Sequence, residues 1–145
     1  MPCAIDILKT KGSTVHWIAP TATVLDAIQK MNMHKLGALV VMDQGRVVGM
    51  FTERDVLTRV MGRMLDPKEA KVSDVMSSDI IYVAPMTDID EISAFMQQRR
   101  IRHLPVISEE GDLFGLISIG DLNAFHASNQ EMTIHYLSEY IYGRA

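Results

Sequence analysis

The chain has 145 residues, a formal net charge of −4 and a pI near 5.7. This length suits one domain, and the acidic balance excludes the broad basic face of duplex-binding proteins, so nucleic acid is not an expected partner. No apolar run approaches the ~20 residues of a membrane span, and the start, with Asp6, does not resemble a secretory signal. Because Cys3 is the only cysteine, no internal disulfide can form, and we expect a cytoplasmic protein.

Elements of the first half are predicted in the order strand, helix, strand, strand, helix. An extended stretch, 15–19, stops at Pro20, and a proline favours an extended residue before it. An apolar stripe with helical spacing follows at Val24, Ile28 and Met31. Two apolar, β-branched runs around a Gly-containing turn then predict a hairpin. The hairpin strands and the start of the second helix are expected at 39–42, 47–51 and Asp55.

The second half repeats this order about 65 residues later, beyond a linker expected at 62–71. Its extended stretch, 80–84, stops at Pro85, and Thr87 is the predicted N-cap of the following helix. The helical stripe, the hairpin strands and the start of the last helix are expected at Ile89, Ile92 and Met96, at 104–107 and 113–117, and at Asp121. Such a repeat indicates two half-domains around a shared core.

The clearest part of the repeat is a glycine, two apolar residues and then a hydroxyl three residues before an aspartate. Thr52 precedes Asp55 in the first half, and Ser118 precedes Asp121 in the second. An ionised carboxylate accepts both hydroxyl protons of a ribose diol, and the Thr or Ser hydroxyl can bind ribose or phosphate. The alternative is that these residues only cap a helix, whose N-terminus would also attract phosphate. The repetition favours a ligand role.

With these segments, the chain resembles a tandem pair of cystathionine-β-synthase (CBS) domains, a Bateman module of the stand-alone bacterial type. The segments that carry the resemblance are 6–8 and 74–76, 37–41 and 102–106, the two hydroxyl-x-x-Asp motifs, and 132–137. The resemblance implies an α+β fold, in which two βαββα repeats pack about a pseudo-two-fold axis. Repeat 1 would span 1–65 and repeat 2, with a C-terminal helix, 66–145, together one structural domain.

The resemblance also implies two clefts, each shared between the repeats, of a kind that binds AMP, ADP, ATP, NAD-type ligands or S-adenosylmethionine. The hydroxyl and aspartate of one repeat would hold ribose, and the opening strand and a loop of the other repeat would frame adenine. One cleft would use Met50, Thr52 and Asp55 with Ile80, Ile81, Arg102, His103 and Leu104. The other would use Leu116, Ser118 and Asp121 with Val15, His16, Gly37 and Ala38.

Cations distinguish the two expected clefts. Arg54 and Arg102 are phosphate candidates in the first cleft, with His103 assisting when protonated, because a guanidinium is a planar fork that stays charged. The alternative is a solvated face, which we prefer for Arg99 and Arg100 and leave open for Arg102 and His103. The second cleft has Gly120, Gly37 and Ala38 at the matching positions, so phosphate affinity is expected in the first cleft.

The function that these features predict is a non-enzymatic regulatory sensor of an adenine nucleotide, with AMP placed before ADP, ATP or NAD. No set of nucleophile, base and metal ligands is recognisable, and the dispersed methionines suit core filling. The alternatives are a constitutive protein-interaction scaffold and an S-adenosylmethionine binder. The expected partners are a second copy of the chain, in a homodimer, and an unidentified regulated enzyme or transporter. An apolar stripe at Ile134, Leu137 and Ile141 predicts a packing or dimerisation helix within 133–143.

Overall fold

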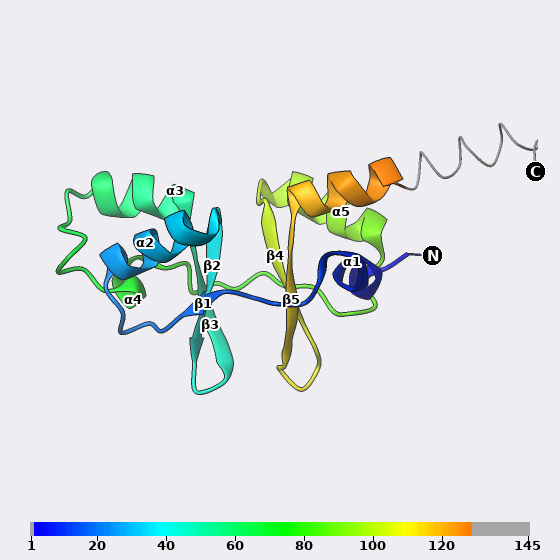
Figure 1. The fold of residues 1–145 in the computed structure, drawn as a ribbon, viewed down its shortest axis with the longest axis horizontal. Coiled ribbons are helices and arrows are strands. Elements are labelled where there is room, and N and C mark those ends of the chain that lie inside the picture. The colour runs from blue at the N-terminus through cyan, green and yellow to red at the C-terminus, as the bar shows by residue number, and fades with distance from the viewer. Residues whose placement is uncertain (1, 129–145) are drawn as a thin grey trace, which may run out of the picture.

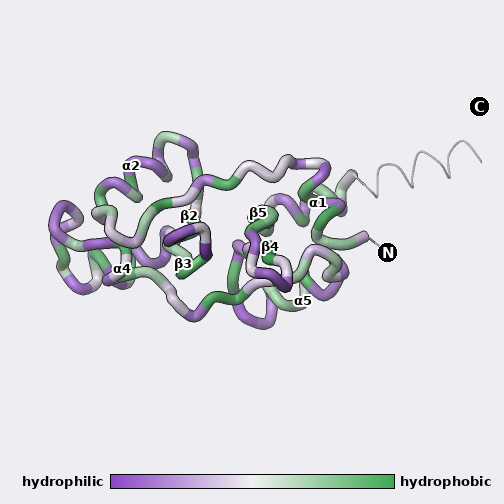
Figure 2. Tube along the Cα trace, turned by 90° about the horizontal axis from the view of Figure 1, so that it is seen from below, coloured by the Kyte–Doolittle hydropathy of each residue, from purple (hydrophilic) through white to green (hydrophobic). Residues whose placement is uncertain are grey.

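Two antiparallel hairpins lie next to each other in the middle of the molecule, and helices of each half flank them (Figure 1). This computed structural model describes residues 2–128, so the helix expected within 133–143 lies outside the described residues. A view from below shows the same side-by-side arrangement of the two halves (Figure 2). The expected α+β architecture of two repeated units is therefore confirmed.

The first half contains a three-stranded sheet and the helix that crosses it. β1 (Trp17–Ile18) pairs in parallel with β2 (Ala38–Asp43), which pairs antiparallel with β3 (Arg46–Thr52). α2 (Val24–His34) connects β1 to β2 and begins after Thr23, whose hydroxyl accepts a backbone N–H of the first turn. Such a cap satisfies one of the N–H groups that a helix leaves unpaired at its start.

The β2–β3 hairpin ends at the first hydroxyl–aspartate motif. Its turn places Gln44 and Gly45 at positive φ, 51° and 76°, and this geometry matches the twist of the strands. α3 (Glu53–Asp55) follows β3 directly and continues as a π-helix, η1 (Val56–Met61). Wider helical turns of this kind are frequent beside functional sites. The predicted hairpin and the helix predicted near Asp55 are both confirmed.

The second half has a shorter sheet than the first. α5 (Ile89–Arg99) leads to β4 (His103–Ile107), which pairs antiparallel with β5 (Leu113–Ser118), and residues 119–128 are helical. The predicted strand at 80–84 does not form a ladder. Within it, only a single parallel bridge joins the segment to β4, between Val83 and Val106.

The predicted N-cap of α5 was wrong by one residue. Asp88 caps the helix, since its Oδ1 accepts the Asp90 backbone N–H at 2.8 Å. Thr87 instead closes the preceding turn, because its hydroxyl accepts the Ala84 backbone N–H at 3.0 Å. Both side chains can serve as acceptors there, and the chain path into the helix decides which one caps it.

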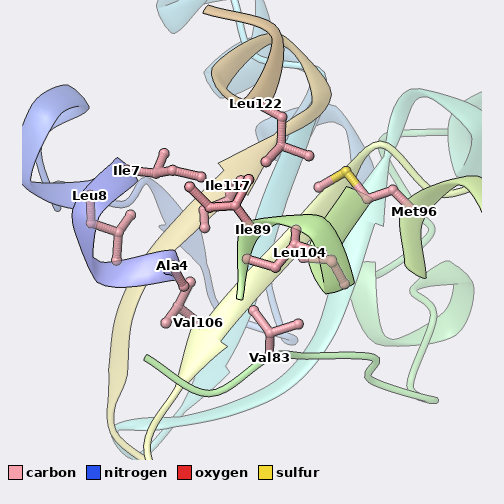
Figure 3. Packing of buried hydrophobic residues seen from close by; sticks show 11 residues of the cluster. Ala4, Ile7, Leu8, Val83, Ile89, Met96, Leu104, Val106, Ile117 and Leu122 are labelled. Carbon is pink, nitrogen blue, oxygen red and sulfur yellow. The ribbon is translucent and has the colours of Figure 1, made fainter. Parts of the chain in front are cut away.

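Two short helices pack across the repeat boundary. α1 (Ala4–Lys11) buries Ala4, Ile7 and Leu8 in the core of the second half, where they contact the side chains of β4, β5 and α5 (Figure 3). α4 (Val72–Val75) buries both of its valines in the core of the first half. The boundary between residues 65 and 66 separates the two repeats in sequence. Each of the two hydrophobic cores, however, combines segments from both sides of this boundary.

The hairpins contact each other through apolar side chains and one polar contact between their turns. Arg46 Nη1 donates to the Glu110 carbonyl at 2.9 Å. This contact joins the two turns, and the apolar cluster joins β2 and β3 to β5. The apolar cluster consists of Ala38, Val40 and Met50 with Val15, Met42, Val47, Leu113 and Leu116.

Candidate functional site

A cavity of about 340 Å³ lies between the Thr52–Asp55 motif of the first half and the loop before β4 of the second. It brings together most of the residues expected in the first cleft, namely Met50, Thr52, Arg54, Asp55, Ile81, Arg102 and His103. Two expected residues, Ile80 and Leu104, are not part of its lining, and the Leu104 side chain is fully buried in the core of the second half.

The Thr52–Asp55 pair caps the helix that begins at the cavity. Asp55 Oδ2 accepts the Thr52 backbone N–H at 2.9 Å and the Thr52 hydroxyl at 3.2 Å. In return, Thr52 Oγ1 accepts the Asp55 backbone N–H at 3.4 Å. The capping role considered from the sequence is thus present. It engages Oδ2 and leaves the second oxygen of the same carboxylate to other partners.

Arg59 is the cation nearest to this carboxylate. Its Nε lies 3.8 Å from Asp55 Oδ1, while its Nη1 donates to the backbone carbonyls of Val75 at 3.2 Å and Met76 at 2.9 Å. The guanidinium is therefore fixed by α4 and is too far from Oδ1 for a hydrogen bond of ordinary length. Oδ1 retains the capacity to accept a hydrogen bond from a ligand.

Three arginines line the same cavity without an acidic partner. Arg54, Arg100 and Arg102 form no ion pair with any carboxylate of residues 2–128. Arg100, which we expected on a solvated face, ends α5 in a left-handed conformation with φ 54° and lines the cavity. Arg99 agrees with that expectation, because it lies over the ring of Phe95 at 5.4 Å and does not line the cavity. Clustered cations favour an anionic ligand.

His103 lies in the same cavity as these arginines, in surroundings that disfavour its charged form. Burial lowers the pKa of its imidazole and the neighbouring Arg102 lowers it further, while Glu53 and Asp121 act in the opposite direction with less effect. The net shift is below the ordinary value of 6.5. The lowered pKa disfavours the charged imidazole in the free protein, and an anion beside His103 would favour it.

Gly37 lines this cavity, whereas the sequence placed it in the other cleft. A Cβ at Gly37 would stand 3.3 Å from His103 Cε1, so glycine lets the loops before β2 and β4 approach each other. The equivalence of Gly37 and Arg102 in the repeat is a signal that could have revealed this contact. The lining residues that sequence reasoning did not select are Glu53, Thr58, Arg59, Ser77, Asp79, Arg100 and Ile101.

The Ser118–Asp121 motif forms the equivalent cap at the helix of residues 119–128. Ser118 N donates to Asp121 Oδ2 at 2.8 Å, and Asp121 N donates to Ser118 Oγ at 3.1 Å. Lys11 Nζ, from the end of α1, lies 2.6 Å from the same Oδ2. Burial would raise the pKa of Asp121, but hydrogen bonds from Lys11 and Ser118 hold it below its ordinary value. Lys11 is a cation at the second motif that the sequence comparison of the two clefts did not select.

Other residues expected in the second cleft make contacts of a structural kind. Val15 and Ala38 pack with Leu116 in the apolar cluster between the hairpins. The His16 ring stacks on the His34 ring with 3.9 Å between centroids, and burial, followed by the charge of His34, lowers the pKa of His16. None of the four expected residues, Val15, His16, Ala38 and Leu116, lines the cavity at the first motif.

A second, more open cavity of about 540 Å³ adjoins the first between α5 and the helix of residues 119–128. Arg54, Arg100 and Arg102 line both cavities, so one group of cations separates them. Met96 and Leu122, both almost fully buried, provide its apolar base.

Within residues 2–128, no three His, Cys, Asp or Glu side chains gather in an arrangement that could hold a metal ion. The same part of the chain contains no helix whose length and hydropathy would let it cross a bilayer.

The CBS domain family model matches residues 6–62 and 72–126. The chain is 34% identical over 147 residues to the mitochondrial CBS domain-containing protein CBSX3 of Arabidopsis thaliana, covering 95% of this chain and 71% of that protein. A solved structure of a proposed signal-transduction protein with CBS domains from Burkholderia ambifaria matches with a TM-score of 0.85 and 37% identity, over 89% and 96% of the two chains. A hexameric CBS-CP12 protein from bloom-forming cyanobacteria matches with a TM-score of 0.72 and 31% identity, over 84% and 69%.

Proposed function

Because the chain belongs to the CBS-domain family, as a tandem pair of CBS domains, we propose that it is a regulatory sensor that binds an adenine nucleotide between its repeats. The observation that carries the proposal is the convergence of two kinds of side chain on one cavity. The first repeat supplies Thr52 and Asp55, a hydroxyl and a carboxylate, and the second supplies Arg102 and His103. A nucleotide needs acceptors for its ribose and cations for its phosphate, and this cavity offers both.

The ribose and base would lie at the Asp55 side of the cavity. Oδ1 of Asp55 is the oxygen that the helix cap leaves to a ligand, and it can accept a ribose hydroxyl proton. Met50, Ile81 and Ile101 line the same space with apolar groups that suit a flat purine ring. Binding the nucleoside therefore uses residues of both repeats.

The phosphate would lie at Arg54, Arg100 and Arg102. These guanidinium groups have no acidic partner within residues 2–128, and an anion among them would relieve their mutual repulsion. AMP is the simplest ligand that satisfies the cavity, and ADP, ATP or NAD would place further negative charge along the arginines toward the adjoining cavity. S-adenosylmethionine fits less well, since it carries a sulfonium cation and no phosphate.

The proposed role is sensing without catalysis. A nucleotide that contacts both repeats binds only when they stand in the right relation, so binding would shift the population of inter-repeat arrangements. A partner protein can respond to such a shift, and we propose that this partner is an enzyme or a transporter. The contacts among Thr52, Asp55 and Arg59 orient a ligand, and they do not form a nucleophile with its base.

Melting curves with adenosine, AMP, ATP, NAD and S-adenosylmethionine test the proposal, because a ligand that binds only the native state raises the melting temperature. A ligand at a hundred times its Kd adds about 2.7 kcal/mol to the free energy of unfolding. We expect phosphate-bearing adenine ligands to stabilise the wild type and to lose most of this effect in Asp55→Asn. If none of the five ligands stabilises the protein, the scaffold alternative is the better account.

A further inference from the structure

The two hydroxyl–aspartate motifs differ in one respect that their sequences do not show. Within residues 2–128, the one cation paired with Asp55 is Arg59, at a distance of 3.8 Å between Nε and Oδ1. Asp121 has the ammonium group of Lys11 at 2.6 Å, and the same ammonium donates to the Leu116 carbonyl at 2.7 Å. A cation of the chain itself thus bridges Leu116 and Asp121, two residues expected in the second cleft, and it contacts the carboxylate oxygen that the helix cap also uses.

Lys11 reaches Asp121 because α1 is longer than its counterpart in the other repeat. α1 has eight residues and ends at Lys11, whereas α4 has four and ends at Val75. Asp6, in the first turn of α1, lies 14 residues before Pro20, whereas Asp74, in the first turn of α4, lies 11 residues before Pro85. The additional helical turn carries the lysine to the second motif.

The short helix holds this lysine in a defined position. Ala4, Ile7 and Leu8 are 0–3% exposed in the core of the second half. Leu8 packs so closely on β5 that a Cβ at Gly115 would meet its Cδ2 at 2.6 Å. The Lys11 side chain is itself only 32% exposed. The contact with Asp121 is therefore part of the packed structure and is not one conformer of a free surface side chain.

The backbone at the first motif shows what the lysine replaces. The Met50 carbonyl, which corresponds to that of Leu116, accepts the backbone N–H of Ser77 at 2.9 Å. This donor is a neutral backbone N–H group, and the Ser77 side chain does not extend to Asp55. At the second motif the donor is an ammonium group, and it bridges from the Leu116 carbonyl to the carboxylate.

From this contrast we infer that Lys11 keeps the second motif closed to nucleosides, so that the chain has one competent nucleotide cleft and not two. The inference deepens the proposed function, because it assumes that both motifs are able to hold ribose. A neutral ribose diol would have to compete with this ammonium, which lies in the cleft between Leu116 and Asp121, for the Asp121 carboxylate. The loss of one such charge-assisted hydrogen bond lowers affinity roughly ten- to a hundredfold.

Calorimetric titration of adenosine and of AMP into wild type, Lys11→Met and Lys9→Met tests the inference. Lys9 is an exposed neighbour on α1 and makes no ion pair with any carboxylate of residues 2–128, so Lys9→Met controls for the change in net charge. Lys11→Gln serves as a second variant that keeps a polar side chain should the methionine disturb the packing of α1. We expect the number of ligands bound per chain to rise by one in both Lys11 variants and to stay at the wild-type value in Lys9→Met.

The added site is then assigned by a second substitution. Asp121→Asn in the Lys11→Met background should remove the added ligand, whereas Asp55→Asn in that background should remove the other one. An unchanged number in both Lys11 variants, or two ligands already bound by wild type, overturns the inference. If wild type binds nothing and Lys11→Met binds one ligand through Asp121, the inference stands and the proposed function of the first cavity fails.

Discussion

The guanidinium of Arg59 lies beside the buried carboxylate of Asp55, with Nε 3.8 Å from Oδ1, and α4 holds it there through the Val75 and Met76 carbonyls. A segment near the start of the second repeat thus fixes a cation at the first repeat's motif. The arrangement places a positive charge close to Asp55, but it leaves Oδ1 without a hydrogen bond of ordinary length from Arg59. The Asp55 residue is 4% exposed, and one of its carboxylate oxygens is left for a ligand.

Asp55→Asn should lower the affinity for adenine nucleotides roughly ten- to a hundredfold, because it removes a charge-assisted hydrogen bond to ribose worth about 1.5–3 kcal/mol. The asparagine oxygen can still cap α3, so folding should survive with a cost of about 1 kcal/mol or less. Calorimetric titration measures the affinity, and urea unfolding measures the stability. Asp74→Asn is the matched control, since Asp74 accepts the Lys71 backbone N–H in a helix cap but does not line the cavity. Equal affinities in both variants would leave Asp55 with the capping role alone.

Arg100→Gln and Arg102→Gln should each weaken ATP binding about two- to fivefold and leave adenosine binding unchanged, because exposed ion pairs contribute roughly 0.2–1 kcal/mol. Raising the salt concentration should reduce the advantage of ATP over adenosine in wild type, since salt screens exposed charges. Arg99→Gln is the matched control, because Arg99 lies on the Phe95 ring away from the cavity. Titrations at two salt concentrations provide the comparison. An equal loss of ATP affinity in Arg99→Gln would indicate a general charge effect and no phosphate site.

The affinity for AMP, relative to adenosine, should rise as the pH falls from 8 to 6. Burial, followed by Arg102, lowers the pKa of His103 in the free protein, and a bound phosphate raises it, so binding takes up a proton. Since the phosphate of AMP titrates near pH 6 as well, the same titrations with His103→Gln supply the baseline. A pH dependence that is identical in wild type and His103→Gln would exclude a role for this imidazole.

His103 should also affect the free energy of unfolding when no ligand is present. Its pKa in the folded protein lies below the unfolded value of 6.5, so the unfolded chain binds the proton first. The contribution of His103 to the free energy of unfolding is therefore present above pH 6.5 and is lost as the pH falls through its folded pKa. Urea unfolding of wild type and His103→Gln between pH 7.5 and 5 should show a smaller loss of stability in the variant. A parallel decline in the two proteins would contradict this assignment.

A homodimer remains our prediction for the assembly. Leu57 and Met61 on η1 are 70% and 60% exposed, and a second copy of the chain would bury such side chains. Light scattering at micromolar concentration should give twice the monomer mass, and the double variant Leu57→Lys/Met61→Lys should shift it toward the monomer. Met86→Lys, at a residue 78% exposed outside η1, is the control for an added charge. A wild-type monomer mass that does not change with concentration would rule out the dimer.

The sequence by itself determined the repeat, the two hairpins and the side chains of the first motif. These features are local or periodic: apolar runs around a Gly-containing turn form a hairpin, and a hydroxyl three residues before an aspartate caps a helix in either half. For this reason Thr52, Asp55 and their equivalents could be selected without coordinates. The sequence did not identify Asp88 as the cap of α5, because Thr87 and Asp88 are both suitable residues and only the path of the chain distinguishes them.

Only the tertiary structure decided which segments meet. The contact between Lys11 and Asp121 joins residues 110 apart, and it depends on the burial of three α1 side chains in the core of the second half. Gly37 faces His103 because the hairpins pack side by side, and Arg59 is fixed by α4, which belongs to the other side of the repeat boundary. No local pattern encodes such pairs, since each is set by how two hydrophobic cores share their segments. The repeat made the two motifs look alike, and the packing of α1 made them different.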